Sequence, residues 1–273
     1  MRACLVLPIF CCVSCAPSHP RADEFLPDFN RSFAEAESAF EKGIQNKGRL
    51  LVARKHFSDS TDAYLKLHRS GSVRSPQLYR NLGNAAVLAD RWPIAIWAYH
   101  VGLKLDPNES HLREQLAFVR GKVTYSPKGQ GRPEPDVWPS WLHRPTTVEY
   151  VWLLVFLYAC LWLAIAWCWV KRAMQSAFLL TGIFIVSVIV CIGSSYNRHQ
   201  FHVDEVTPLV VVLENTDFYR GNAMSYPKHP DLPYLPRGLE ARQLHRRGDW
   251  LQLRLSTGEI GWIPAGNVRV VEP

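Results

Sequence analysis

VEYVWLLVFLYACLWLAIAWCWV, from Val148 to Val170, is followed after only two residues, Lys171 and Arg172, by AMQSAFLLTGIFIVSVIVCIGSS, from Ala173 to Ser195. An α-helix rises about 1.5 Å per residue, so each stretch would span about 35 Å, whereas a bilayer core is about 30 Å thick. Residues 148–170 and 173–195 are therefore predicted to be two transmembrane helices. Because their connection is so short, they should form an antiparallel hairpin with both flanking segments on one side of the membrane.

The N-terminus predicts which side that is. An apolar run at residues 3–16 ends in small residues, as in a secretory signal peptide, which would occupy residues 1–22. Both flanking segments would then face the periplasm, in a two-pass protein of the bacterial inner (cytoplasmic) membrane, with the basic bend of the hairpin in the cytoplasm. Basic residues at the opposite flanks, Arg144 and Arg198, keep the reverse orientation as an alternative.

Cys15 permits a second kind of anchor. Small residues precede it, as in the lipobox of bacterial lipoproteins, where the cysteine is acylated, but Cys12 stands where leucine is usual. Cleavage near Ala16 or Ala22 satisfies the same small-residue rule. Lipidation at Cys15 and ordinary cleavage are therefore both open.

Charge and cysteine content exclude some classes of function. The net charge of +7 is spread over 273 residues, and no segment is basic enough to predict nucleic acid as a partner. The seven cysteines all lie in the signal or in the two apolar stretches. Segments 23–147 and 200–273 therefore have no disulfide framework and no thiolate metal site.

Residues 23–125 have the three- and four-residue spacing of amphipathic helices. Ser75-Pro76 indicates a helix start and Gly121 a helix end. In order and spacing, eight residues resemble the tetratricopeptide (TPR) repeat: Tyr79, Leu82, Gly83, Ala86, Ala95, Tyr99, Gly102 and Pro107. An earlier copy is degraded, with Glu41 where the glycine belongs. We expect an all-α TPR solenoid.

The first helix of each TPR repeat lines a groove, so the resemblance implies a peptide-binding groove at Gln77, Arg80, Asn84, Val87 and Leu88. Arg80 and Asn84 lie one turn apart and share a helix face. TPR domains that bind peptide carboxylates carry a basic residue and an asparagine at such positions, which favours a partner's C-terminus or an acidic segment. The alternative is that both are ordinary solvated surface residues.

The pattern changes after the helical segment. Residues 126–147 are rich in proline and glycine and are predicted to be a linker. Residues 200–273 alternate with period two, and strands are expected at Leu209 to Leu213, Leu239 to Leu244 and Trp250 to Leu255. The glycines and tryptophans at the intervening turns resemble a bacterial SH3-type domain, which implies an all-β SH3-like small barrel.

The SH3-type resemblance implies a binding surface at Trp250, Trp262 and Pro264. The acidic, tyrosine-rich loop of the peptide-binding relatives is not evident, so recognition of proline-rich peptides is not expected. The alternative is that both tryptophans close the barrel core, because buried aromatic residues dominate small cores. A local basic patch that would suit an anionic surface comprises Arg242, Arg246 and Arg247.

Motifs of catalysis are not found. The chain has no glycine-rich phosphate loop, no Gly-x-Ser-x-Gly and no His-Glu-x-x-His. His199 and His202 lie next to Asp204 and Glu205 and would suit a metal, but a polar collar after the second apolar stretch explains them more simply. We predict that the protein is not an enzyme and needs no cofactor.

The order of the segments resembles that of the BatE-like proteins of the bacterial aerotolerance (Bat) family. The resemblance implies a complex assembled under stress with membrane-anchored von Willebrand factor A proteins, a BatD-like protein and a MoxR-type ATPase. We therefore expect a non-enzymatic membrane scaffold in the lipid bilayer that binds other membrane proteins. The alternative is a module that binds the cell wall (peptidoglycan) through the SH3-type domain and anchors a membrane complex there.

Overall fold

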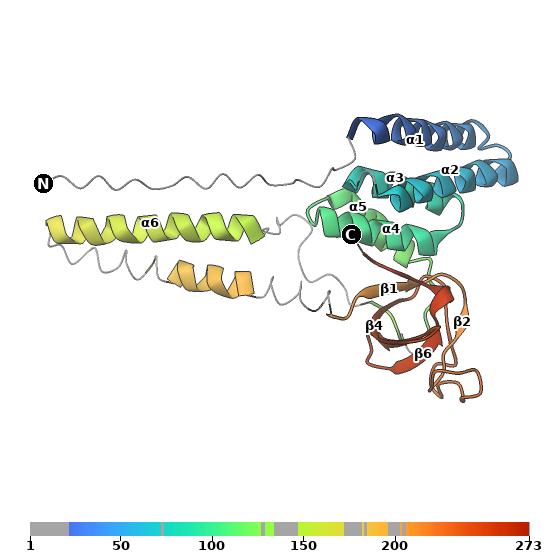
Figure 1. Ribbon diagram of the computed structural model, residues 1–273. Coiled ribbons are helices and arrows are strands. Elements are labelled where there is room, and N and C mark those ends of the chain that lie inside the picture. Colours follow the sequence, from blue (N-terminus) through green and yellow to red (C-terminus); the bar gives the residue numbers. More distant parts are fainter. Residues whose placement is uncertain are drawn as a thin grey trace, which may run out of the picture.

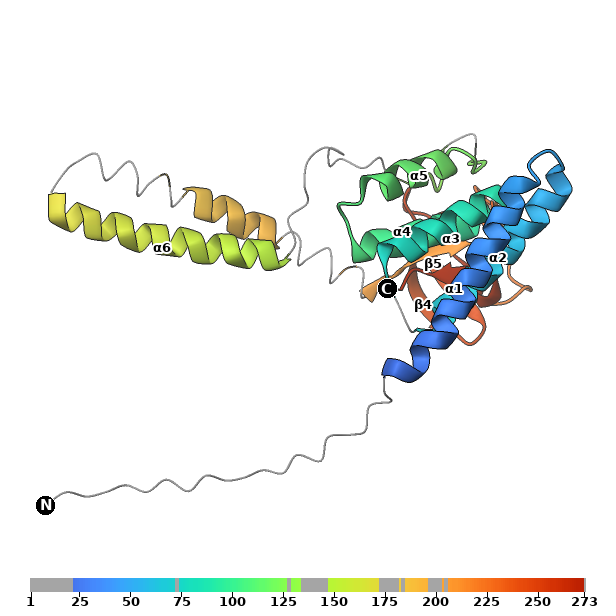
Figure 2. The ribbon, with the colours of Figure 1, turned by 90° about the horizontal axis from the view of Figure 1, so that it is seen from above.

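The computed structural model describes residues 22–71, 74–126, 129–133, 147–171, 182, 185–195, 203 and 206–272. Helices α1 to α5 form a layer, here called the helical layer (residues 22–126), that lies against a small antiparallel sheet domain (residues 206–272) (Figure 1). Helix α6 and the helical residues 185–195 lie side by side and away from this body in both views (Figures 1 and 2).

The helical layer is built from antiparallel pairs. Its elements are α1 (Ala22–Gln45), α2 (Leu50–Ser70), α3 (Pro76–Leu88), α4 (Trp92–Leu105) and α5 (Ser110–Arg120). The side chain of Ser75 caps α3 by accepting a hydrogen bond from the Leu78 amide at 3.2 Å, and Gly71 ends α2 with a φ of 67°. Gly121 ends α5. These helix ends are where the sequence signals predicted them.

Each helix pair closes around a glycine. A Cβ atom at Gly83 would lie 2.2 Å from Cε1 of Tyr99, and one at Gly43 would lie 2.6 Å from Cε1 of Phe57. Only glycine allows so close an approach of a backbone to a ring. The pair α1–α2 is thus built like the pair α3–α4, and Gly43 has the role that the sequence pattern assigned to Glu41.

The sheet domain contains five strands in the order β6-β5-β4-β1-β7, with every neighbouring pair antiparallel. The strands are β1 (Leu209–Val212), β4 (Glu240–Arg247), β5 (Trp250–Leu255), β6 (Ile260–Pro264) and β7 (Val268–Val270). β2 (Thr216–Asp217) pairs with β3 (Tyr234–Leu235), and the short helix η1 (Ala265–Asn267) precedes β7. Gly238, Gly248 and Gly258 have positive φ and form the predicted turns.

The helical layer and the sheet domain share a hydrophobic core. Val211 of β1 and Val271 after β7 pack into the cluster formed by α1 to α5. The indole of Trp97 on α4 is 1% exposed and donates a hydrogen bond to the Val270 carbonyl at 2.8 Å. The Arg269 guanidinium lies 3.9 Å from the centre of the same ring. The two domains therefore form one packed body.

Glu240 is a buried charge at this junction. Arg120 at the end of α5 donates two hydrogen bonds to its carboxylate, at 2.7 and 2.6 Å, and His100 of α4 lies 2.8 Å from it. Burial alone would raise the pKa of Glu240, but the contacts with His100 and Arg120 outweigh burial and lower the pKa to about 2. Strand β4 is thus tied to two helices by a carboxylate that stays ionised.

The predicted linker, residues 126–147, is described at 126, 129–133 and 147. Residues 129–133 lie along the sheet domain. The Gly131 amide donates to Oγ1 of Thr257 at 3.0 Å, and the Ser256 hydroxyl donates to the Arg132 carbonyl at 2.7 Å. This segment of the chain therefore adds to the contact between the two domains.

The prediction of two transmembrane helices is wrong. α6 (Thr147–Lys171) includes the first predicted span, 148–170, and within the second, 173–195, the continuous helix described is 185–195. None of the described helices is both long enough and apolar enough to cross a membrane. A span needs about 20 apolar residues in one continuous helix.

The predicted membrane fold class and the predicted location are wrong as well, because both depended on the two spans. The two-pass arrangement in a bacterial inner membrane, with both domains facing the periplasm, is contradicted by the same finding. The predicted signal, residues 1–22, lies outside the described residues apart from Ala22, and so does the lipidation candidate Cys15. The candidate metal residues His199, His202, Asp204 and Glu205 also lie outside them.

Candidate functional site

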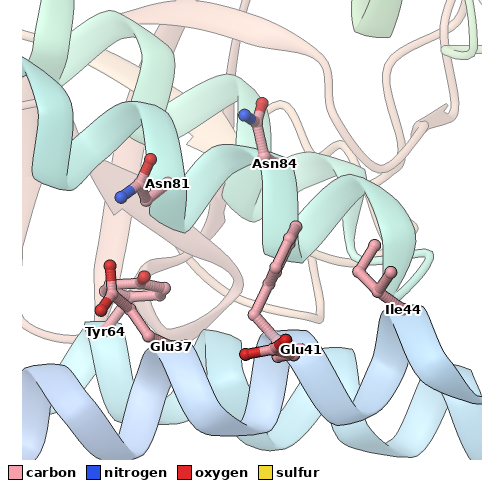
Figure 3. A pocket seen from close by; sticks show the side chains of 7 residues that line it. Glu37, Glu41, Ile44, Tyr64, Asn81 and Asn84 are labelled. Atoms are coloured by element: carbon pink, nitrogen blue, oxygen red, sulfur yellow. The ribbon is translucent and has the colours of Figure 1, made fainter.

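A cavity of about 560 Å³ lies between α1 and α3 (Figure 3). Helix α2 packs on α1 and also on α3. Helices α1 and α3 therefore lie on two sides of the cavity, and α2 contributes to its floor. The lining residues come from these three helices: Glu37, Phe40, Glu41, Ile44, Tyr64, Asn81 and Asn84. The cavity, here called the α1–α3 groove, is large enough for several side chains of a bound segment.

The floor of the groove is apolar and aromatic. Tyr64 of α2 is 2% exposed, and its ring packs edge-on against Phe33 with centroids 6.1 Å apart. Phe40 packs edge-on against Phe57 at 5.3 Å. Burial and then the neighbouring charge of Glu37 raise the pKa of Tyr64 to about 12, so the phenol is neutral. The floor therefore consists of the half-buried ring of Phe40 and the buried, uncharged phenol of Tyr64.

The rim of the groove carries charge on one side and amides on the other. Glu37 and Glu41 lie one turn apart on α1, and Asn81 and Asn84 lie on α3 across the cavity. In Figure 3 the Glu37 carboxylate is directed toward Asn81, the Glu41 carboxylate lies over the α1 ribbon, and the Asn84 amide points away from α1. Both glutamates are exposed, and neither forms a salt bridge with a described residue. Oδ1 of Asn84 accepts a hydrogen bond from the Tyr99 hydroxyl at 2.8 Å, which fixes the orientation of that amide. The groove is therefore negative.

The structure brings one of the five predicted groove residues into this cavity, namely Asn84. Arg80 forms a salt bridge with Glu109 at 3.6 Å, near the start of α5. Gln77 and Leu88 are exposed elsewhere on α3, and Val87 packs partly against the core of the helical layer. The predicted pair of Arg80 and Asn84 therefore does not converge on the groove, and the binding of a carboxylate there stays a prediction without support from its surroundings.

Sequence reasoning missed Glu37, Glu41 and Asn81 as groove residues. The repeat pattern identifies Glu41 only as a departure from the expected glycine. Glu37 and Glu41 are four residues apart, so they share a helix face, and Asn81 and Asn84 are three apart. The available signal for a groove was therefore a pair of polar residues sharing one face on the first helix of each of two successive repeats.

A second surface lies on the outer face of the sheet domain. Leu251, Leu253 and Leu255 of β5 point into the sheet core, so the residues between them point outward. Cross-strand partners on this outer face are Trp250 with Pro264, and Gln252 with Trp262. The ring of Tyr219 packs edge-on against Trp250 at 5.6 Å.

The three predicted SH3-type surface residues therefore lie together. Trp250, Trp262 and Pro264 are half-buried on this outer face and are not part of the buried core, so the alternative that the tryptophans fill the core does not describe this sheet. In the predicted basic patch, register places Arg242 and Arg247 on the same face as Trp250 and places Arg246 on the opposite one. Nearer β1 and β7, the helical layer covers the outer face.

Comparison of the chain with known proteins gives no match to a family model, to a curated protein or to a solved structure.

Proposed function

We propose that this chain is a non-enzymatic binding protein that holds an extended segment of a partner protein in the α1–α3 groove. The observation that carries the proposal is the cavity of about 560 Å³, with an aromatic floor and a rim of carboxylates and amides. Extended peptides are bound by such surfaces because apolar floors take up side chains while rim amides pair with the peptide backbone. The firm packing of α1 to α3 supports a groove that exists before the partner arrives.

The test uses the full chain and an array of random short peptides. Ile44→Trp fills the groove with a larger apolar side chain and leaves the charge of the rim unchanged, so peptide binding should fall at least tenfold. Ser38→Trp places the same ring on an exposed position of α1 outside the cavity and should bind like the native chain. Circular dichroism checks that both variants are folded. Equal binding by the native chain and Ile44→Trp would refute the groove as the binding site.

A second candidate function is binding of cell-wall glycan by the outer face of the sheet domain. The half-buried rings of Trp250 and Trp262, with Tyr219 beside them, support it because aromatic faces suit sugar rings. The test is co-sedimentation of the full chain with purified peptidoglycan. The full chain is needed because the sheet domain shares its core with the helices. Trp250→Ala should reduce sedimentation, and exposed Met224→Ala is the control.

The partners implied by the Bat resemblance are not carried into this proposal. That resemblance depended on the order of segments with two membrane spans at its centre, and no such span is found among the described helices. The groove supports a protein partner by its shape and chemistry alone.

A further inference from the structure

We propose that the α1–α3 groove selects a partner segment that presents a lysine or arginine side chain, and that this cation binds between the carboxylates of Glu37 and Glu41. The inference rests on the proposed function, because it names the chemistry of the segment that the groove holds. The bound segment would then be basic, whereas the sequence pair Arg80 and Asn84 favoured an acidic segment.

The two carboxylates share one side of the groove without a partner of opposite charge. Glu37 and Glu41 lie four residues apart on α1, and like charges at this spacing repel each other. No salt bridge with a described residue relieves either of them. In Figure 3 the carboxylate of Glu37 lies beside Tyr64 and points toward Asn81. A cation placed between the two carboxylates would relieve their repulsion and gain attraction from both.

The floor suits the same ligand. The half-buried ring of Phe40 lines the cavity next to the carboxylates, whereas Tyr64, at 2% exposure, offers little of its ring. A guanidinium or ammonium group over an aromatic face is attracted to it, and the aliphatic stem of either side chain gains from apolar contact. The Asn81 amide can pair with the backbone beside that residue, whereas Oδ1 of Asn84 is already engaged by the Tyr99 hydroxyl. All parts of the groove thus fit one long basic side chain in an extended segment.

A carboxylate ligand would be repelled in the same groove. It would enter a rim with two carboxylates, and the nearest arginine of α3, Arg80, is already engaged by Glu109 at 3.6 Å. None of the seven lining residues, all of which are described, is basic. Charge complementarity therefore favours a basic segment over an acidic one.

The experiment uses peptides from the array whose binding is lost in Ile44→Trp. These peptides should be enriched in lysine and arginine, and replacing that residue by neutral citrulline or norleucine should weaken binding about tenfold in fluorescence anisotropy. In Glu37→Gln/Glu41→Gln the basic and neutral peptides should bind almost equally. Glu35→Gln removes one charge from an exposed position of the same helix outside the groove and should keep the preference.

The outcomes separate this inference from the proposed function. Binding that Ile44→Trp abolishes, but that shows no preference for basic peptides and is unchanged in Glu37→Gln/Glu41→Gln, would refute the charge selection and leave the groove in place. Binding that is insensitive to Ile44→Trp would refute the groove itself. A preference that survives in Glu37→Gln/Glu41→Gln at low and high salt would place the cation elsewhere and refute the inference.

Discussion

The carboxylate of Glu240 lies where strand β4 meets α4 and α5, and its neighbours decide its charge. At 5% exposure a lone carboxylate would be protonated or would unfold the junction. Two hydrogen bonds from Arg120 and the contact with His100 keep it ionised, with a pKa of about 2. A single side chain thus couples two domains that are far apart in the sequence.

Replacing Glu240 by glutamine should destabilise the protein by about 3 to 5 kcal/mol, because the guanidinium of Arg120 would lose the charge that compensates its partial burial. Chemical denaturation monitored by tryptophan fluorescence measures this loss. Glu214→Gln is the matched control, since Glu214 is exposed in the same domain, and it should change stability by less than about 0.5 kcal/mol. Similar small losses in both variants would show that the junction is not held by Glu240.

The pH dependence of stability follows from the same carboxylate. The pKa of Glu240 is lowered from an ordinary value of 4.5 to about 2 in the folded chain, so the folded state favours the ionised form. Its contribution is complete above about pH 5 and is lost as the pH falls through 4.5 toward 2. The native chain should therefore lose more stability than Glu240→Gln over this interval. Parallel stability curves for the two proteins would contradict the assignment.

At the scale of elements, the sequence predicted the helix ends and strands that depend on a few neighbouring residues. The cap at Ser75, the end at Gly121 and the alternation in β5 were all predictable because each is decided within about six residues. The pairing of α1 with α2 was harder to predict. Positions 43 and 57 are two residues closer in sequence than positions 83 and 99, so a fixed repeat spacing points to Glu41 instead of Gly43.

The fixed repeat spacing also gave no indication of the α1 side of the groove. The TPR pattern indicates binding residues on α3, because the repeat containing α3 matches that pattern well. Glu37 and Glu41 lie on the first helix of the degraded copy, and their closeness to Asn81 and Asn84 depends on how α1, α2 and α3 stack. That stacking is a tertiary property, and local periodicity does not specify it.

Gly83→Ala tests the close approach within a helix pair. A Cβ atom at this position would lie 2.2 Å from Cε1 of Tyr99, which is fully buried, so the ring would have to move into a packed core. The free energy of unfolding should fall by about 1 to 3 kcal/mol despite the better helix propensity of alanine. Gly48→Ala, where a Cβ would contact nothing within 4 Å, is the control and should be neutral or stabilising in thermal unfolding. A neutral Gly83→Ala would mean that α3 and α4 pack less closely than described.

At the scale of the whole molecule, the docking of the helical layer on the sheet domain decides how the protein folds. The contacts join residues that are far apart in the sequence, such as Trp97 and Val270, so no local pattern predicts them. One signal was present. The sequence of α4, WPIAIWAYHVGLKL, is apolar on nearly all sides, and a helix of this kind must be covered on more than one face. α3 covers one face of α4, and the sheet domain covers another.

Trp97→Ala should therefore weaken both domains together. The substitution removes a fully buried ring, its hydrogen bond to Val270 and the contact with Arg269, and it should cost about 3 to 5 kcal/mol in the free energy of unfolding. Hydrogen exchange measured by mass spectrometry should speed up in β1 and β7 as well as in α4, because their shared core opens. Trp262→Ala removes an indole from the uncovered part of the sheet, so exchange should change only near β6. Faster exchange in α4 with unchanged β1 and β7 would show that the two domains unfold independently.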